Sequence, residues 1–215
     1  MKSVSLTIDG ARLVAPEGQN LLQVALDNGI YIANLCHLGD KPEPAAACRL
    51  CFVEVEGRNQ PVTACTETAA GGMVVNTRGE DALGLARAGF ELLMASHGTD
   101  CAHCPINGGC ELQKIAHHLG SKLKSKRLRK PVRELPVDNT NPRFIYHPDK
   151  CVLCGRCVWV CQERLGIGVL GFAHRGFERR VTTFGDGPMG NLRCQECGEC
   201  IKVCPAGALI SKEGG

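Results

Sequence analysis

The sequence is poor in aromatic residues and has no long apolar run. Aromatic side chains make up 4% of its 215 residues, with a single Trp, so an ordinary hydrophobic core would be thin and something else must tie the loops together. No stretch approaches the roughly 20 apolar residues of a membrane-spanning helix, and we expect no transmembrane segment. Lys and Arg number 25 against 22 Asp and Glu, a balance that predicts neither a nucleic-acid nor a membrane partner.

Cysteine is what the chain has in excess, with 15 residues. Disulfides would explain that number in a secreted protein, but three observations argue against them. The N-terminus, MKSVSLTIDG, alternates like a strand and lacks the apolar core of a signal peptide. The cysteine count is odd, and the Cys-x-x-Cys clustering suits metal ligands better than distant cross-links. We therefore expect a reducing compartment and a cytoplasmic protein.

Eight of the cysteines form two identical runs in the last quarter of the chain. The runs are Cys151-x-x-Cys154-x-x-Cys157-x-x-x-Cys161 and Cys194-x-x-Cys197-x-x-Cys200-x-x-x-Cys204, the second followed by Pro205. Two intervening residues let a tight loop direct consecutive sulfurs at one cluster, and the three-residue step begins a helical turn that carries the fourth sulfur away. Zinc knuckles are the alternative, but four tetrahedral ligands give no reason for a displaced fourth thiolate, twice over.

Both runs resemble those of two-cluster ferredoxins, in which each run gives three thiolates to one [4Fe–4S] cluster and its fourth to the other. The resemblance implies that one cluster is held by Cys151, Cys154, Cys157 and Cys204. It implies that the other is held by Cys161, Cys194, Cys197 and Cys200. Gln162 follows Cys161 where Pro is usual, which marks a branch of the family and leaves the cluster assignment intact.

The first eighty residues have the pattern of short strands around one helix. Alternation predicts strands over 4–8, 12–15, 51–56, 62–65 and 73–76, and Asp9-Gly10 is a hairpin turn signal. A helix is predicted over 21–27, capped by Asn20 and stopped by Gly29. Two strands, a helix and further strands are the order of a β-grasp domain.

Four cysteines lie within that frame: Cys36, Cys48, Cys51 and Cys65. Plant-type [2Fe–2S] ferredoxins use a similar quartet with a first gap of four residues, whereas the first gap here is 11 residues and the last is 13. The sequence resembles the variant found in the peripheral arm of respiratory complex I and in related NAD-linked hydrogenases, including Ala47-Cys48-Arg49-Leu50-Cys51 running into Val53-Glu54-Val55. The resemblance implies a [2Fe–2S] cluster on this quartet. A single such cysteine would otherwise be a small buried hydrophobe.

The middle of the chain carries a rarer pattern. A helix predicted over 81–94 leads to His97, and Cys101-x-x-Cys104 and Cys110 follow. This resembles the His/Cys3 [4Fe–4S] site of the same family, including the sequence GCELQ at 109–113, and implies ligation by His97, Cys101, Cys104 and Cys110. His103, in the same loop, is a competing ligand. An imidazole ligand in place of a thiolate removes a negative charge from the site and would raise the reduction potential of the cluster.

Ligand counting favours His97. At four ligands per cluster, one [2Fe–2S] and three [4Fe–4S] clusters use all 15 cysteines and one histidine, with none left over. Such a set of clusters would bring about 14 iron atoms to the chain.

Two further stretches carry weaker signals. Residues 122–133 are rich in Lys and Arg, Pro131 and Pro136 break regular structure, and a helix is predicted before them over 110–118. A solvated linker over 121–140 is the favoured interpretation. A docking strip for an acidic partner subunit is the alternative, and binding of nucleic acid is a weaker alternative.

Gly166–Gly171 matches G-x-G-x-x-G, but it follows a cluster loop and precedes turn-rich sequence. We therefore expect a hairpin (172–174 with 180–183) rather than a nucleotide site.

The predicted architecture is α+β. It comprises a [2Fe–2S] β-grasp domain (1–78), a small helical His/Cys3 cluster domain (79–120), the basic linker (121–140) and a two-cluster ferredoxin domain (141–215) that opens with a strand over 144–146. This order resembles the N-terminal iron–sulfur region of the large peripheral-arm subunit of complex I, of [FeFe] hydrogenases and of NAD-dependent formate dehydrogenases. As a chain ending at Gly215, it is most similar to the small diaphorase subunits of bidirectional NAD(P)-linked [NiFe] hydrogenases.

The resemblance implies a subunit that is not catalytic alone. It would relay single electrons through four clusters between a flavin-containing NAD(P)H subunit and a partner redox enzyme, foremost a [NiFe] hydrogenase. The same electron relay could serve a formate dehydrogenase, an electron-bifurcating enzyme or a complex I-like NADH dehydrogenase. A free multi-cluster ferredoxin carrier and a zinc-bound interaction or nucleic-acid module are the alternatives from other classes.

Overall fold

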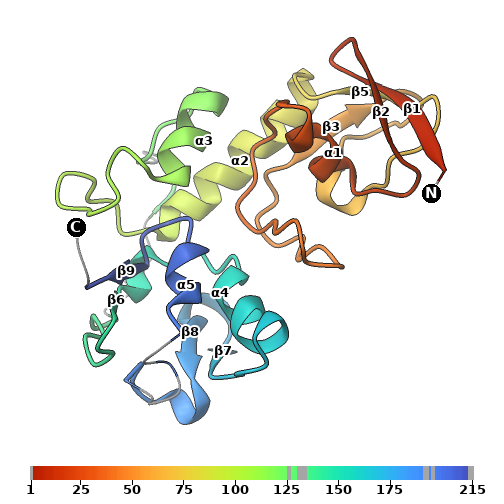
Figure 1. The fold of residues 1–215 in the computed structure, drawn as a ribbon. Helices are drawn as coiled ribbons and strands as arrows, with labels where there is room; N and C mark the ends of the chain where they lie inside the picture. Colours follow the sequence, from red (N-terminus) through yellow and green to blue (C-terminus); the bar gives the residue numbers. More distant parts are fainter. Residues whose placement is uncertain (1, 125–126, 130–134, 191–193, 195–196, 213–215) are drawn as a thin grey trace. The chain divides into compact units, whose positions relative to one another are not determined.

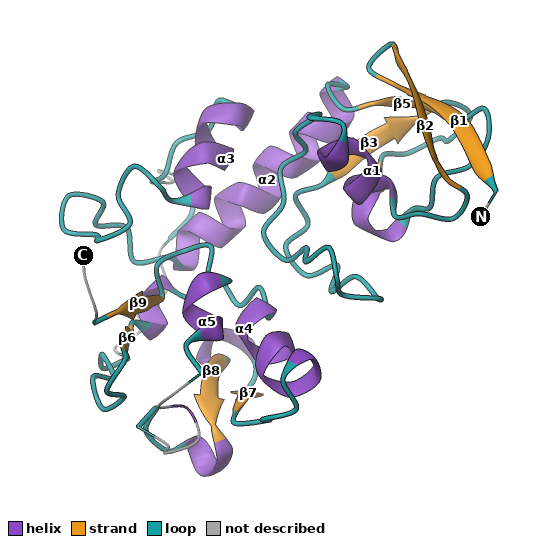
Figure 2. Cartoon of the chain, in the orientation of Figure 1, coloured by secondary structure: helices purple, strands orange, loops and turns teal. Residues whose placement is uncertain are grey.

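The computed structural model describes residues 2–124, 127–129, 135–190, 194 and 197–212 (Figure 1). Contacts within the chain divide it into two compact units: Met1–Glu91 with Ile115–Ser121, and Leu92–Lys114 with Lys122–Gly215. Both units mix helices and strands (Figure 2). Over the described ranges, no helix has the length and apolarity that a membrane crossing requires.

The first unit is built on a five-stranded sheet with the order β2-β1-β5-β3-β4. Its strands are β1 Ser3–Ile8, β2 Ala11–Pro16, β3 Phe52–Val55, β4 Val62–Thr63 and β5 Val74–Asn76. The predicted hairpin is confirmed: β1 and β2 pair antiparallel through a turn in which Asp9 and Gly10 have φ of 50° and 83°, as a type I′ turn requires. β5 runs parallel to β1 and antiparallel to β3.

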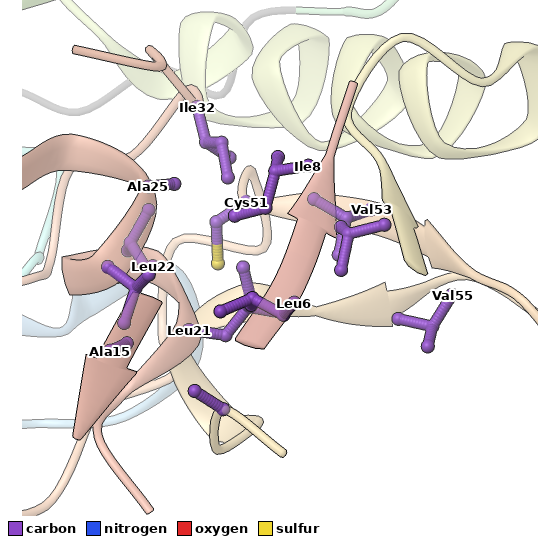
Figure 3. Close-up of a cluster of buried hydrophobic side chains, with 14 of the residues drawn as sticks. Leu6, Ile8, Ala15, Leu21, Leu22, Ala25, Ile32, Cys51, Val53 and Val55 are labelled. Carbon is purple, nitrogen blue, oxygen red and sulfur yellow. The ribbon is translucent and has the colours of Figure 1, made fainter. Parts of the chain in front are cut away.

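Helix α1 (Leu21–Asp27) has the predicted bounds. The Asn20 side chain accepts a hydrogen bond from the backbone N–H of Gln23 at 3.2 Å, so the predicted cap forms. Leu21, Leu22 and Ala25 are fully buried in a core shared with the strands (Figure 3). Within the described residues, this core cluster is aliphatic apart from two cysteines, Cys51 and Cys65. This cluster therefore packs without aromatic side chains, and the fully buried Phe90 of the same unit lies outside it.

Three strands of this sheet are shorter than the alternation predicted. The strand expected over 51–56 is β3 (Phe52–Val55), and the one expected over 73–76 is β5 (Val74–Asn76). The strand expected over 62–65 is β4 (Val62–Thr63), which passes into a 3-10 turn over Ala64–Thr66. The Thr66 hydroxyl donates to the Thr63 carbonyl at 2.9 Å and closes this turn. Cys65 therefore lies in a turn directly after the end of β4, and its carbonyl accepts a hydrogen bond from the Asn20 amide at 2.6 Å.

Helix α2 (Glu80–Ser96) extends beyond the predicted bounds at both ends. Near its start the backbone N–H of Ala82 donates to the Glu54 carboxylate of β3 at 3.4 Å. Gly89 allows the helix to approach the loop before β3, because a Cβ atom at Gly89 would lie 2.5 Å from the Arg49 carbonyl oxygen. Helix α3 spans Glu111–Leu119, and the Leu119 carbonyl accepts from Arg87 Nε at 2.9 Å within the first unit.

The second unit carries two small antiparallel sheets and short helices. β6 (Phe144–Tyr146) pairs with β9 (Leu209–Ser211), and β7 (Leu170–Ala173) pairs with β8 (Arg180–Thr183). The helices are α4 (Arg156–Trp159), which continues into a π turn over Val160–Arg164, and α5 (Glu199–Lys202). The core of this unit includes Phe144, Leu170 and Leu209 and several of the cysteines.

The second hairpin differs from the prediction in one arm. β7 begins at Leu170, not at 172, and ends before His174, which has a left-handed φ of 61°. The His174 ring turns instead to the Asp186 carboxylate, 3.0 Å away. The glycine-rich stretch therefore runs into a strand rather than a helix, and the expected hairpin forms with β8. Of the predicted linker, residues 125–126 and 130–134 lie outside the described part of the chain.

Paired substitutions in α2 test the role of Gly89. Gly84→Ala, at an exposed position with no atom within 4 Å of the added Cβ, should stabilise the helix by about 1 kcal/mol because Ala is the better helix former. Gly89→Ala should lower the thermal unfolding temperature despite the same propensity gain, since the methyl group meets the Arg49 carbonyl. Circular dichroism melts of both variants measure this; equal stabilisation would show that the close approach is unimportant.

Candidate iron–sulfur centres

Four cysteines are buried together in the first unit. Cys36, Cys48, Cys51 and Cys65 are each 5% exposed or less, and the Sγ atoms of Cys36 and Cys48 lie 3.5 Å apart. Cys51 and Cys65 are likewise joined by a thiol hydrogen bond. Ala46 and Arg49 have φ of 47° and 53° and curve the loop that carries Cys48 and Cys51. The structure thus brings the predicted quartet together.

The electrostatics of this quartet oppose ionisation of the thiols. The hydrogen bond with Cys36, followed by burial, raises the pKa of Cys48, and the bond with Cys65, followed by burial, raises that of Cys51. The pKa of Cys65 is lowered, chiefly because Cys51 donates to it. A cationic group is needed before all four can be thiolates, since metal binding to cysteine displaces the thiol protons.

A second set of candidate ligands lines one cavity in the second unit. His97, Cys101, Cys104 and Cys110 face about 350 Å³ of space free of protein atoms, and Met94 contributes an apolar wall. Burial raises the pKa of Cys110, which precedes α3, while backbone N–H groups at the start of that helix act in the opposite direction. The four residues that the resemblance implied therefore share one site.

The ring of His97 is held by the backbone of a distant segment. Its Nδ1 donates to the Lys150 carbonyl at 3.0 Å, and the neighbouring Gly98 N–H donates to the Asp149 carbonyl at 2.8 Å. Donation from Nδ1 leaves the lone pair on Nε2, the arrangement typical of metal-ligating histidines. His103 points elsewhere: its side chain is 84% exposed and pairs with Asp100 at 2.9 Å. The geometry supports His97 over His103 as the ligand.

A second cavity in this unit is lined by cysteines from both ferredoxin-like runs. Cys151, Cys154 and Cys157 of the first run and Cys204 of the second face about 360 Å³ of space free of protein atoms. Burial raises the pKa of Cys154 to about 12, and the thiols of Cys151 and Cys204 add to the shift. Gly155, with φ of 78°, turns the chain into α4 between the second and third of these cysteines.

The remaining four cysteines show the reciprocal crossing. Burial raises the pKa of Cys194 to about 11 and that of Cys200 to about 12, and Cys161 and Cys197 are among the thiols that raise both further. Cys161 lies in the π turn after α4 and accepts a hydrogen bond from the Leu170 N–H at 3.4 Å. The fourth cysteine of each run therefore lies with the first three of the other.

The segment after Cys204 separates two of these sites. Ala206 lines both the His97 cavity and the Cys204 cavity, and the Cys110 thiol donates to the Pro205 carbonyl at 3.9 Å. Gly207 has φ of 64°, and a Cβ there would lie 2.8 Å from the Ile106 side chain and 3.5 Å from Cys104 Sγ. The two cavities are neighbours that share one residue as a wall.

Sequence reasoning missed the groups that come from outside the cysteine motifs. These are the Lys150 carbonyl, the Ala206 wall and Tyr146, which lines the cavity of Cys151 and Cys204. Tyr146 could have been noticed as an aromatic with a polar tip at an inward position of a strand. Within the described ranges, no three His, Cys, Asp or Glu side chains converge as ligands of a single ion do; two of the candidate sets line cavities instead.

Family models match three consecutive parts of the chain. Residues 1–80 match a 2Fe-2S iron–sulfur cluster binding domain, and residues 87–123 match the NADH-ubiquinone oxidoreductase-G iron–sulfur binding region. Residues 142–210 match the ferredoxin-like domain of NADH-quinone oxidoreductase subunit 3. The chain thus combines a [2Fe–2S] domain with [4Fe–4S]-type regions.

Individual relatives extend this match over nearly the whole chain. Subunit HndD of the NADP-reducing hydrogenase of Solidesulfovibrio fructosivorans is 34% identical over 99% of this chain, which spans only 37% of that protein. The alpha subunit of the NADPH-Fe(3+) oxidoreductase of Geobacter sulfurreducens is 35% identical, and the chain spans 24% of it. The gamma subunit of the NAD-reducing hydrogenase HoxS of Cupriavidus necator is 32% identical over 99% of this chain and 89% of its own length.

One solved structure shows the same arrangement. A chain in the crystal structure of an NAD+-reducing [NiFe]-hydrogenase in the H2-reduced state is 28% identical, with a TM-score of 0.86 over 100% of this chain and 89% of that one. Together with the near full-length match to HoxS gamma, this similarity shows that the chain belongs to the family of the iron–sulfur gamma subunit of NAD-reducing hydrogenases.

Proposed function

We propose that the chain is an electron-transfer subunit that binds one [2Fe–2S] and three [4Fe–4S] clusters. The [2Fe–2S] ligands are Cys36, Cys48, Cys51 and Cys65. The [4Fe–4S] ligand sets are His97, Cys101, Cys104 and Cys110; Cys151, Cys154, Cys157 and Cys204; and Cys161, Cys194, Cys197 and Cys200. The observation that carries the proposal is that two of these sets, the one with His97 and the one with Cys204, each line a single cavity.

The residues fit such clusters by their chemistry. Thiolate and imidazole are ligands that iron–sulfur centres use. The raised pKa values of the buried thiols call for a cationic partner, and backbone N–H donors such as that of Leu170 reach ligand sulfur. The proposed domains are a β-grasp [2Fe–2S] domain (1–78), a helical His/Cys3 domain (79–120), a basic linker (121–140) and a two-cluster domain (141–215).

Iron–sulfur clusters, when bound, supply one-electron transfer at potentials set by their ligands and surroundings. The protein's own residues hold the ligands in place and exclude water from them. The Lys150 carbonyl fixes the His97 ring, and Met94 and Leu112 give the His97 site an apolar wall. Ala206 lines both this site and the cavity that contains Cys204, so the two sites share it as a wall. No hydride chemistry is assigned to this chain, which is not catalytic alone.

We assign the two ends of the relay to partner subunits. A flavin-containing NAD(P)H subunit at one end and a [NiFe] hydrogenase at the other are supported by the similarity to HoxS gamma and to the solved NAD+-reducing hydrogenase. A formate dehydrogenase, an electron-bifurcating enzyme or a complex I-like NADH dehydrogenase is the second candidate; matches to complex I subunits favour the last of these. The proposed location is the cytoplasm.

Anaerobic affinity purification of the tagged chain from its source organism tests this proposal. We expect stoichiometric co-purification of a flavin subunit and a nickel hydrogenase, identified by mass spectrometry, and about 14 iron atoms per copy of this chain. A different redox enzyme in the complex would change the reaction and keep the relay. Absence of any partner would favour a free carrier, and zinc in place of iron would overturn the cluster assignment.

A pair of cysteine substitutions tests the histidine ligand. His97→Cys should retain the cluster and lower its midpoint potential, because a thiolate adds negative charge; we expect at least a tenfold change in the reduction equilibrium, about 59 mV for one electron. His103→Cys is the matched control and should leave the potential unchanged. Anaerobic redox titration followed by electron paramagnetic resonance (EPR) measures both. A shift confined to the His103 variant would reverse the assignment.

A further inference from the structure

Tyr146 presents a buried hydroxyl beside the candidate ligand Cys151. The residue is 4% exposed, and its hydroxyl oxygen, buried from solvent, makes no full hydrogen bond within the described part of the chain, although the Cys151 thiol and the Val181 backbone lie close enough to interact with it. A buried hydroxyl without a full hydrogen bond costs free energy, which a bound acceptor beside it would recover. Tyr146 lies in the core of the second unit beside the cysteines.

The rest of the residue is firmly placed. Tyr146 pairs with Leu209 across β6 and β9, and its N–H and C=O exchange hydrogen bonds with Asp138 at 2.8 and 2.9 Å. Both backbone groups are therefore satisfied, and the strand register decides where the side chain points. That direction is the cavity of Cys151, Cys154, Cys157 and Cys204, which Tyr146 helps to line.

The hydroxyl is a phenol, whose ordinary pKa of about 10 keeps it protonated at physiological pH. A protonated phenol beside anionic sulfur is a hydrogen-bond donor, and bonds to charged acceptors are stronger than neutral ones.

We propose that the Tyr146 hydroxyl donates a hydrogen bond to sulfur of the cluster held by Cys151, Cys154, Cys157 and Cys204, and thereby raises its potential. This inference rests on the proposed function and names a positioning and tuning residue outside the ligand motifs. The bond strengthens when the sulfur gains negative charge, so it stabilises the reduced state over the oxidised one. Hydrogen bonds to sulfur are among the factors that set cluster potentials.

Tyr146→Phe in the full-length, cluster-loaded chain removes only the hydroxyl. We expect unchanged iron content and a more negative midpoint for one of the three [4Fe–4S] signals, on the order of a tenfold change in the reduction equilibrium, or about 59 mV. The [2Fe–2S] signal should not move. Tyr31→Phe is the matched control: it removes the hydroxyl of the chain's other tyrosine, which lies in the first unit and contacts His118.

A complementary variant keeps the proposal testable if Tyr146→Phe loses the cluster. Because the chain has 2 tyrosines, 3-fluorotyrosine incorporated into the Tyr31→Phe background labels Tyr146 alone. The fluorinated phenol is more acidic and a stronger donor, so the same signal should shift to a more positive potential. Unchanged midpoints with full iron content would overturn the hydrogen bond while leaving the four-cluster proposal intact. A wild-type chain that binds no iron would instead contradict the proposed function.

Discussion

The free-energy cost of burying several ionisable thiols side by side is the constraint on which this structure depends. Burial raises the pKa values of these cysteines, to about 12 at Cys154 and Cys200, and repulsion from neighbouring thiolates adds to the rise. Bound iron would reverse that balance by neutralising the sulfur charge. A chain with few aromatic side chains can then order its long loops around such centres, as its thin aliphatic core alone would not.

The backbone of the cysteine loops is shaped by a few left-handed positions. Gly155 and Gly198 have φ of 78° and 66° at corresponding places in the two runs, and each precedes a four-residue helix. Arg49, in the loop of the first unit, shows that a non-glycine residue can serve the same purpose at φ of 53°. Equal spacing thus produces equal local geometry, and the helical turn that follows carries the fourth sulfur to the other site.

The sites of the second unit share structural parts and are not independent modules. The segment that opens the first ferredoxin-like run supplies the Lys150 carbonyl that orients His97, and the segment that closes the second run supplies the wall at Ala206. Separating these elements would expose ligands of both sites. This sharing is consistent with Leu92–Lys114 packing in the same compact unit as the two runs.

Local chemistry was enough to predict much of the chain from its sequence. The Asp9-Gly10 turn, the cap at Asn20 and the bounds of α1 depend on neighbouring residues. Cysteine spacing, together with the family resemblance, gave the ligand candidates. The tertiary structure decided what depends on distant contacts. The orientation of the His97 ring rests on a carbonyl 53 residues away, and the 3-10 turn at Cys65 lies against Asn20, 45 residues earlier. The orientation of Tyr146 follows from pairing with β9, a register that strand periodicity by itself does not specify.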